Sequence, residues 1–133
     1  MPKEQVFFFG CVLFFFWLGY LNVARVEVIY KSRSDTYTTA ANGVTVDCRT
    51  IPLSSFSLQV SPTGNVTAWN VRLEGSLDNL TFITLLTHTE ATGSGEVLVT
   101  GSVLAPYLYF RSRCATITLG SGTNVIATVV GKA

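Results

Sequence analysis

The fold is decided by the stretch Trp69-Asn-Val-Arg-Leu-Glu-Gly-Ser-Leu-Asp-Asn-Leu-Thr-Phe82, which joins two strand-like patterns through a turn. In the first pattern, apolar residues at 69, 71 and 73 alternate with Asn70, Arg72 and Glu74, so the two kinds fall on opposite faces of a strand. The segment Gly75 to Asn79 is rich in turn residues, and a second run leads from it to Phe82. The stretch therefore predicts a β-hairpin in a sandwich, and it contains no recognisable catalytic centre.

The chain from Ala24 onward has the composition of an all-β domain. Thr, Ser, Val and Gly dominate it, apolar residues alternate with polar ones, and no window shows a sustained helical period. Turn signals recur about every 8 to 12 residues, which favours a sandwich over an open sheet. We expect strands at residues 25–31, 43–49, 55–60, 68–74, 81–87, 96–100, 107–114, 115–119 and 124–130.

These strands predict a single antiparallel β-sandwich over residues 25–133. A jelly-roll-like and an immunoglobulin-like arrangement both remain open, because they produce the same alternation. Apolar residues spaced two apart identify the core face of each strand. The predicted core sets are Val26, Val28 and Tyr30; Val44, Val46 and Cys48; Phe56, Leu58 and Val60; Trp69, Val71 and Leu73; and Leu108 with Phe110.

Length and charge limit the function. A chain of 133 residues fits one domain of this kind, and its net charge is +1. The basic residues are scattered along the sequence instead of being massed on one segment. Nothing in this pattern predicts a nucleic-acid partner.

Residues 1–24 form a separate apolar N-terminal segment. Val6 to Ala24 carries no charge and holds six of the nine phenylalanines, so it accounts for much of the positive mean hydropathy of the chain. At about 1.5 Å per residue, such a run is long enough to cross a bilayer as a helix. The open interpretations are a membrane anchor, a secretory signal, an extension from a start site assigned too far upstream, or an arm that packs on a neighbouring subunit. A membrane is a partner only if the segment is an anchor.

A search for catalytic, cofactor-binding and metal-binding residues yields none. The single histidine, His88, is expected in a solvated loop, and one histidine cannot build a histidine-rich zinc site. Asp78 is expected to bond to its own turn backbone instead of acting as a general acid. Cys48 and Cys114 are the only pair available to the domain; they form a disulfide if the domain is exported, or remain buried thiols in a reducing compartment. We therefore expect no enzyme activity.

The late strand carries a row of aromatic and basic side chains on the face opposite Leu108 and Phe110. The row consists of Tyr107, Tyr109, Arg111 and Arg113. Tyr and Arg are enriched at protein interfaces, because they bury a large area and keep hydrogen-bonding groups. The row is therefore a candidate subunit contact, and the alternative is a half-buried face on which the arginines stack on tyrosine rings.

Several short motifs follow one another in a characteristic order. They are Val44-Thr-Val-Asp47, Phe56-Ser-Leu-Gln-Val60, Val71-Arg-Leu-Glu-Gly-Ser-Leu-Asp78, Pro106-Tyr-Leu-Tyr-Phe-Arg111 and Ile126-Ala-Thr-Val-Val-Gly131. This order resembles small β-sandwich structural proteins of tailed bacteriophages. The resemblance covers about residues 38–131, and two features depart from it: Asn79 replaces the usual turn glycine, and the apolar segment before Arg25 is foreign to the pattern.

This resemblance implies a non-enzymatic virion protein, either a capsid decoration protein or a tail-associated one. Its expected partners are capsid or tail proteins of the same virus, and repeated attachment to a symmetric particle implies a homo-oligomer with avidity. The alternative is an exported or membrane-tethered sandwich that recognises carbohydrate or protein. That alternative draws on the apolar segment, on a disulfide between the two cysteines and on exposed aromatic residues such as Tyr37.

Overall fold

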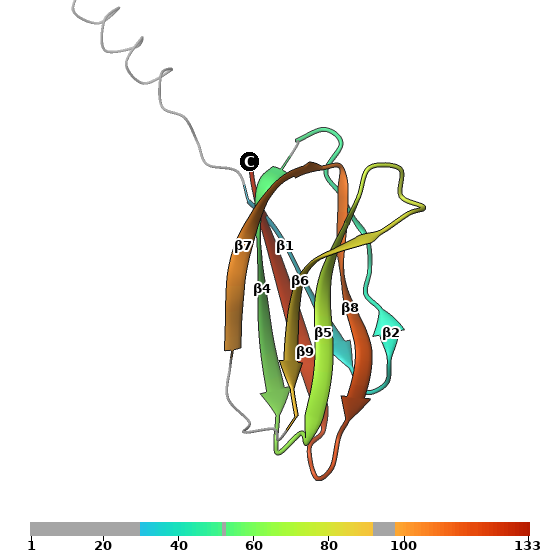
Figure 1. Cartoon of the computed structure of the whole chain (residues 1–133), viewed down its shortest axis with the longest axis vertical. Coiled ribbons are helices and arrows are strands. Elements are labelled where there is room, and N and C mark those ends of the chain that lie inside the picture. The colour runs from blue at the N-terminus through green and yellow to red at the C-terminus, as the bar shows by residue number, and fades with distance from the viewer. Residues whose placement is uncertain (1–29, 52, 92–97) are drawn as a thin grey trace, which may run out of the picture.

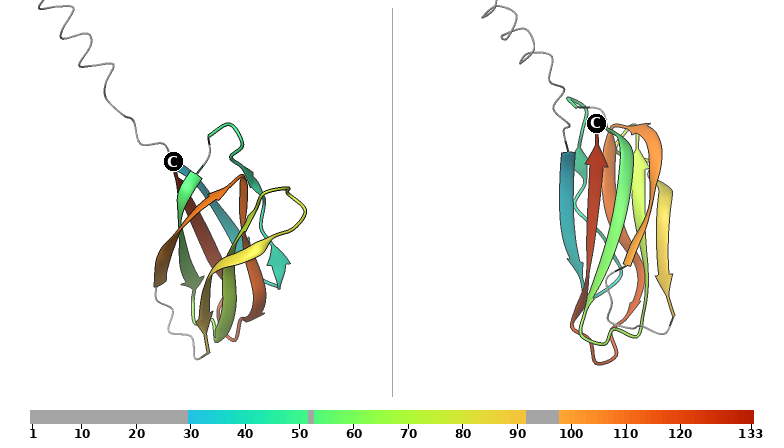
Figure 2. Two further views of the ribbon diagram at one scale, coloured as in Figure 1. Left: turned by 45° about the horizontal axis from the view of Figure 1, so that its top comes forward. Right: turned by 90° about the vertical axis from the view of Figure 1, so that its left-hand side faces the viewer.

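The computed structural model describes residues 30–51, 53–91 and 98–133, and these ranges form two packed β-sheets (Figures 1 and 2). The apolar segment 1–24 and the predicted core residues Val26 and Val28 lie outside the described residues. Within the described ranges, no helix is long and apolar enough to span a membrane. The strands are β1 (Tyr30–Tyr37), β2 (Ala41–Asn42), β3 (Val46–Asp47), β4 (Leu53–Thr63), β5 (Ala68–Ser76), β6 (Ile83–Glu90), β7 (Leu98–Tyr107), β8 (Tyr109–Thr118) and β9 (Asn124–Lys132).

The strand order is that of a jelly roll. One sheet, here called sheet A, has the order β1-β9-β4-β7, and the other, sheet B, has the order β2-β8-β5-β6 with β3 also paired to β8. All these pairs are antiparallel, and β2 and β3 together take the place of one strand. Two interlocked Greek keys produce this order, so the arrangement left open by the sequence is the jelly roll. The all-β sandwich itself is confirmed.

The predicted hairpin pairs as expected, and its apolar face lies in the core. Trp69, Val71 and Leu73 are buried between the sheets, as are the three predicted core residues of β4. Two predicted core residues are exposed instead: Tyr30 begins the edge strand β1, and Val44 lies between the short strands β2 and β3. Neither position has a second sheet layer above it, so alternation alone misassigned them.

Several strand boundaries differ from the prediction. The expected strands 107–114 and 115–119 form one strand, β8. The pairing of β8 with β5 has an irregularity opposite Asn70 and Val71, and the sequence pattern predicted a break between two strands at this place. The expected strand 96–100 is longer in the structure, because β7 continues through Pro106 to Tyr107, and the chain crosses to sheet B at Leu108. A proline fits here because β7 is an edge strand. Within the expected strand 43–49 only β3 is formed, and the short strand β2 precedes it. In the described residues β1 runs from 30 to 37, beyond the predicted end at residue 31.

A buried polar cluster joins the two sheets at the β1 edge. Ser112 of β8 donates a hydrogen bond of 2.9 Å to the Asp35 carboxylate of β1, and its hydroxyl also bonds to the hydroxyl of Tyr37. Gly43 lies over this cluster so closely that a Cβ there would meet all three side chains at 2.4–2.5 Å. Arg33 pairs with the outer carboxylate oxygen of Asp35 at 3.1 Å. These contacts hold the edge strand β1 against sheet B.

We expect the phenol of Tyr37 to titrate late. Burial raises its pKa to about 12, whereas the unfolded chain loses the same proton near pH 10. Folding therefore favours the protonated phenol, and stability falls as the pH rises from about 10 to about 12. An absorbance titration of the phenolates should show one late tyrosine that Tyr37→Phe removes. A variant with an unchanged titration curve would contradict the burial of this hydroxyl.

Candidate functional site

The structure divides the predicted tyrosine and arginine row between two strands. Tyr109, Arg111 and Arg113 lie on the outer face of β8 in sheet B, because Phe110 and Ser112 between them point into the core. Tyr107 belongs instead to β7 in sheet A. Its ring packs edge-on against Phe56, with 6.4 Å between ring centroids. Three residues of the row therefore share one face, and the fourth lies at the mouth between the two sheets.

Glu74 is a buried carboxylate on the same outer face. The alternation of the sequence placed it in solvent, but the residue is only 3% exposed, so that expectation was wrong. Arg111 donates from Nε to Glu74 Oε2 at 2.8 Å, and Arg113 lies 3.4 Å from Oε1. The guanidinium of Arg111 in turn lies 3.8 Å from the ring centroid of Phe82, which the loop 77–82 places over β8. The ring of Phe82 therefore covers one side of the Arg111 guanidinium, and both members of the ion pair are largely removed from solvent.

The turn of the hairpin is organised by its own side chains. The Ser76 hydroxyl accepts from the backbone N–H of Asn79 at 3.0 Å, and Asp78 Oδ1 accepts from Leu80 at 2.9 Å and from Thr81 at 2.8 Å. The backbone N–H groups of Thr81 and Leu80 therefore hold the pKa of Asp78 below its usual range. The turn role predicted for this carboxylate is confirmed. Asn79 adopts a left-handed backbone with φ of 60°, a conformation that glycine or asparagine tolerates best.

This turn exposes three large apolar side chains, here called the apolar tip: Leu77, Leu80 and Ile83. Leu80 is 86% exposed, and the other two are about half exposed or more. Beside them is a cavity of about 310 Å³ lined by Leu77, Asp78, Thr81, Ile83 and Tyr107. The loop that carries the tip projects from the side of the sandwich (Figure 1). The sequence pattern placed Leu77 in the predicted turn, Leu80 in the run that follows it and Ile83 in a strand, and it did not identify the tip. Three bulky aliphatic residues around a turn were the available signal.

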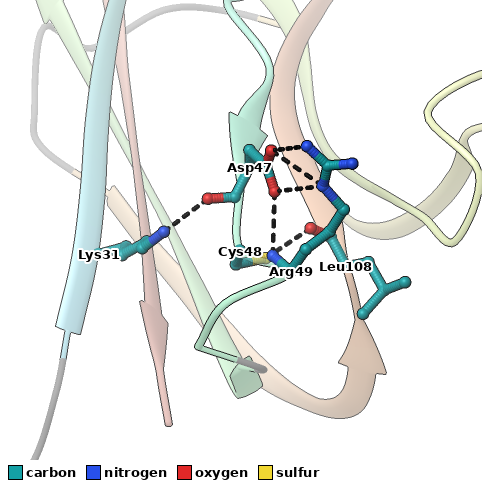
Figure 3. Close-up of polar contacts among 5 residues, drawn as sticks. All are labelled: Lys31, Asp47, Cys48, Arg49 and Leu108. Atoms are coloured by element: carbon teal, nitrogen blue, oxygen red, sulfur yellow. Dashed lines mark hydrogen bonds and ion pairs between the residues drawn. The ribbon is translucent and has the colours of Figure 1, made fainter.

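A network of polar contacts attaches β3 to its neighbours (Figure 3). Arg49 forms a bidentate pair with Asp47, with a closest distance of 2.7 Å, and lies 5.5 Å from the ring centroid of Tyr109. Lys31 of β1 donates to the backbone carbonyl of Asp47. The ring of Tyr109 is thus partly covered by Arg49. The sequence interpretation in which the arginines of the row stack on tyrosine rings differs from the contacts observed. Arg111 lies over Phe82, and the arginine over Tyr109 is Arg49, which is not part of the row.

His88 does not lie in a solvated loop. It is part of β6, is partly buried, and its Nδ1 accepts a hydrogen bond of 3.0 Å from the indole N–H of Trp69. The two rings also stack, with 6.0 Å between centroids. The side chain therefore supports a core tryptophan. Across the described ranges, no three His, Cys, Asp or Glu residues gather in a way that could hold a metal ion.

Cys48 and Cys114 are both buried free thiols. The backbone N–H and the thiol of Cys48 both bond to the carbonyl of Leu108, at 2.9 and 3.0 Å (Figure 3). Cys114 lies six residues beyond Leu108 in the chain. At about 3.3 Å per strand residue, this separates Cys114 from Cys48 by roughly 20 Å. A disulfide needs Cα atoms within about 7 Å, so the two residues are not placed to form one.

No family model matches the sequence, and no curated protein matches it. The solved structures that share its fold include the following two. The SPBc2 prophage-derived protein YomS superposes with a TM-score of 0.60 over 83% of this chain and 98% of its own, at 6% sequence identity. The PBSX exported protein XepA superposes with a TM-score of 0.56 over 79% of this chain at 15% identity, and this chain spans only 36% of XepA. At these identities the likeness shows the fold alone.

Removal of the Arg111 guanidinium should destabilise the domain. Arg111→Met leaves a buried carboxylate with one weak partner, and the free energy of unfolding should fall by about 3 kcal/mol. Arg49→Met is the matched control, because it breaks an ion pair whose two side chains are 62% and 49% exposed and should hardly move the unfolding midpoint. Urea denaturation followed by circular dichroism measures both. Equal effects of the two substitutions would show that Glu74 is not buried.

The thiols should resist modification until the chain unfolds. Burial raises the pKa of both Cys48 and Cys114, so each is protonated and covered at neutral pH. In a Cys11→Ser variant kept free of reductant, Ellman's reagent should react slowly with the folded protein. It should then titrate two thiols in denaturant. A count of zero in denaturant would instead reveal a disulfide.

Proposed function

We propose that this chain is a non-enzymatic structural protein of a virus particle, which binds other capsid or tail subunits. The observation that carries the proposal is the jelly roll shared with the prophage-derived YomS over 83% of this chain and 98% of YomS. Jelly rolls recur as capsid and lectin domains, so the fold suits attachment. The motif resemblance to small sandwich proteins of tailed phages supports the same class of function.

The apolar tip is the proposed centre of attachment. Of the large hydrophobic residues that are exposed in the described part of the chain, Leu77, Leu80 and Ile83 gather at one place, next to a cavity that one or two partner side chains would fill. Clustered apolar exposure marks interaction sites, whereas single exposed residues are ordinary. The hydrogen-bonded turn keeps the tip in one conformation, which lowers the entropy lost on binding.

The alternative is an exported binding module, and XepA, which is described as an exported protein, favours it. One of its supports is now weaker, because Cys48 and Cys114 lie too far apart for the stabilising disulfide that an exported domain would use. A second support is also weaker, since Tyr37 is buried and cannot serve as an exposed aromatic contact.

Co-sedimentation of the full chain with particles of the virus that encodes it tests the proposal. We expect the wild-type chain to sediment with assembled particles. Leu80→Ser should weaken this association at least tenfold, because it removes the most exposed apolar side chain of the tip without disturbing the core.

Tyr30→Ser is the matched control. Tyr30 is also an exposed large hydrophobic residue, but it lies on β1 at the edge of sheet A, whereas the apolar tip is attached to sheet B. It should sediment with particles as the wild type does. A chain that is secreted and never associates with particles would overturn the virion proposal in favour of the exported module. Normal association of Leu80→Ser would move the contact away from the tip.

A further inference from the structure

The outer face of sheet B carries an unbalanced group of positive charges, here called the arginine face: Arg72, Arg111 and Arg113. Arg72 is directly opposite Arg113 in the β5–β8 ladder, and Glu74 is directly opposite Arg111. The three guanidinium groups have one buried carboxylate among them, which pairs with Arg111 and Arg113, so the group carries an excess of two positive charges. The nearby Asp47 does not correct this excess, because Arg49 occupies it.

The pairing of Arg72 with Arg113 is unfavourable for folding alone. Opposite side chains in an antiparallel ladder lie about 5 Å apart at Cβ, and like charges in that position repel. In the described part of the chain, Arg72 bonds only through Nε, to Asn70 Oδ1 at 3.0 Å. Arg113 is 44% exposed and makes only the long contact of 3.4 Å to Glu74. Most N–H donors of both guanidinium groups therefore remain free for a ligand.

A depression beside Arg113 adds a place for such a ligand. It has a volume of about 200 Å³ and is lined by Ala40, Ala41, Asn42, Arg113, Cys114 and Ala115. Asn42 is directly opposite Arg113 in the β2–β8 ladder, so an amide and a guanidinium flank the same hollow. The three alanines leave room without supplying apolar bulk. The size and the donors suit a single carboxylate, which a guanidinium can bind through two parallel hydrogen bonds.

We propose that the arginine face binds an acidic segment of another virion subunit, with carboxylates at Arg72 and Arg113. This inference rests on the proposed function and names the chemistry of the partner. A protein is favoured over an acidic polysaccharide because the residues around Arg72 and Arg113 are Asn, Thr and Ala, and the neighbouring Tyr109 ring is covered by Arg49. Sugar rings need an open aromatic face on which to stack. Two excess charges are also few for a nucleic-acid backbone.

Binding of defined polyanions to the immobilised full chain tests this inference. Poly-L-glutamate should bind, and its affinity should fall as salt is raised from 50 to 300 mM. Arg72→Gln combined with Arg113→Gln should weaken binding at least tenfold. The matched control, Lys31→Gln combined with Lys132→Gln, removes the same two charges from strands of sheet A and should leave most of the affinity intact.

The single variant Arg72→Gln guards against misfolding of the double variant, because the side-chain hydrogen bond of Arg72 in the described residues goes to Asn70 alone. Removal of the Arg72 guanidinium should still weaken binding several-fold. Equal weakening by the control pair would overturn the inference, because net charge alone would then explain binding. Binding of polygalacturonate but not of poly-L-glutamate would assign the face to polysaccharide instead.

If the double arginine variant sediments normally with particles, the proposal of an acidic partner is wrong, while the virion proposal stands. If poly-L-glutamate binds through these arginines but the chain never associates with virus particles, only the virion proposal fails.

Discussion

The buried carboxylate of Glu74 is the constraint on which the outer face of sheet B depends. A charge at this depth must be paired, and it draws Arg111 to 2.8 Å and Arg113 to 3.4 Å. Arg111 in turn lies over the ring of Phe82, so the loop after β5 is fixed across the sheet. The position of the apolar tip follows from this chain of contacts. An ion pair on the outside of a sandwich thus determines where the molecule presents its exposed hydrophobic side chains.

Much of the fold could be predicted, because alternation reports directly on a two-layer sandwich. The sets Phe56, Leu58, Val60 and Trp69, Val71, Leu73 are core residues in the structure. Alternation failed where a third layer or an edge intervenes: the loop 77–82 covers Glu74, and no second sheet covers Tyr30. The strand order could not be predicted from the alternation either. It depends on contacts such as that of Ser112 with Asp35, which is 77 residues away in the chain. His88 was misplaced because its partner, Trp69, is on a neighbouring strand.

The two proposed contacts belong to the same sheet and have different physical characters. The apolar tip offers hydrophobic area on a turn that its own hydrogen bonds hold, and the arginine face offers directional donors with an excess of positive charge. Interfaces commonly combine a buried apolar centre with charged surroundings that orient the partner. The predicted row of Tyr107, Tyr109, Arg111 and Arg113 therefore has mixed roles: Tyr107 lines the cavity, Arg111 supports Glu74, and Arg113 is available for a partner.

A cryo-electron microscopy map of the virus particle with this chain attached tests the central claim most directly. The account predicts that sheet B faces the particle, with Leu77, Leu80 and Ile83 buried in the contact and acidic side chains of the partner at Arg72 and Arg113. It also predicts that the ion pair between Glu74 and Arg111 is unchanged by binding. A map in which sheet A makes the contact, while the apolar tip and the arginine face remain in solvent, would contradict the account.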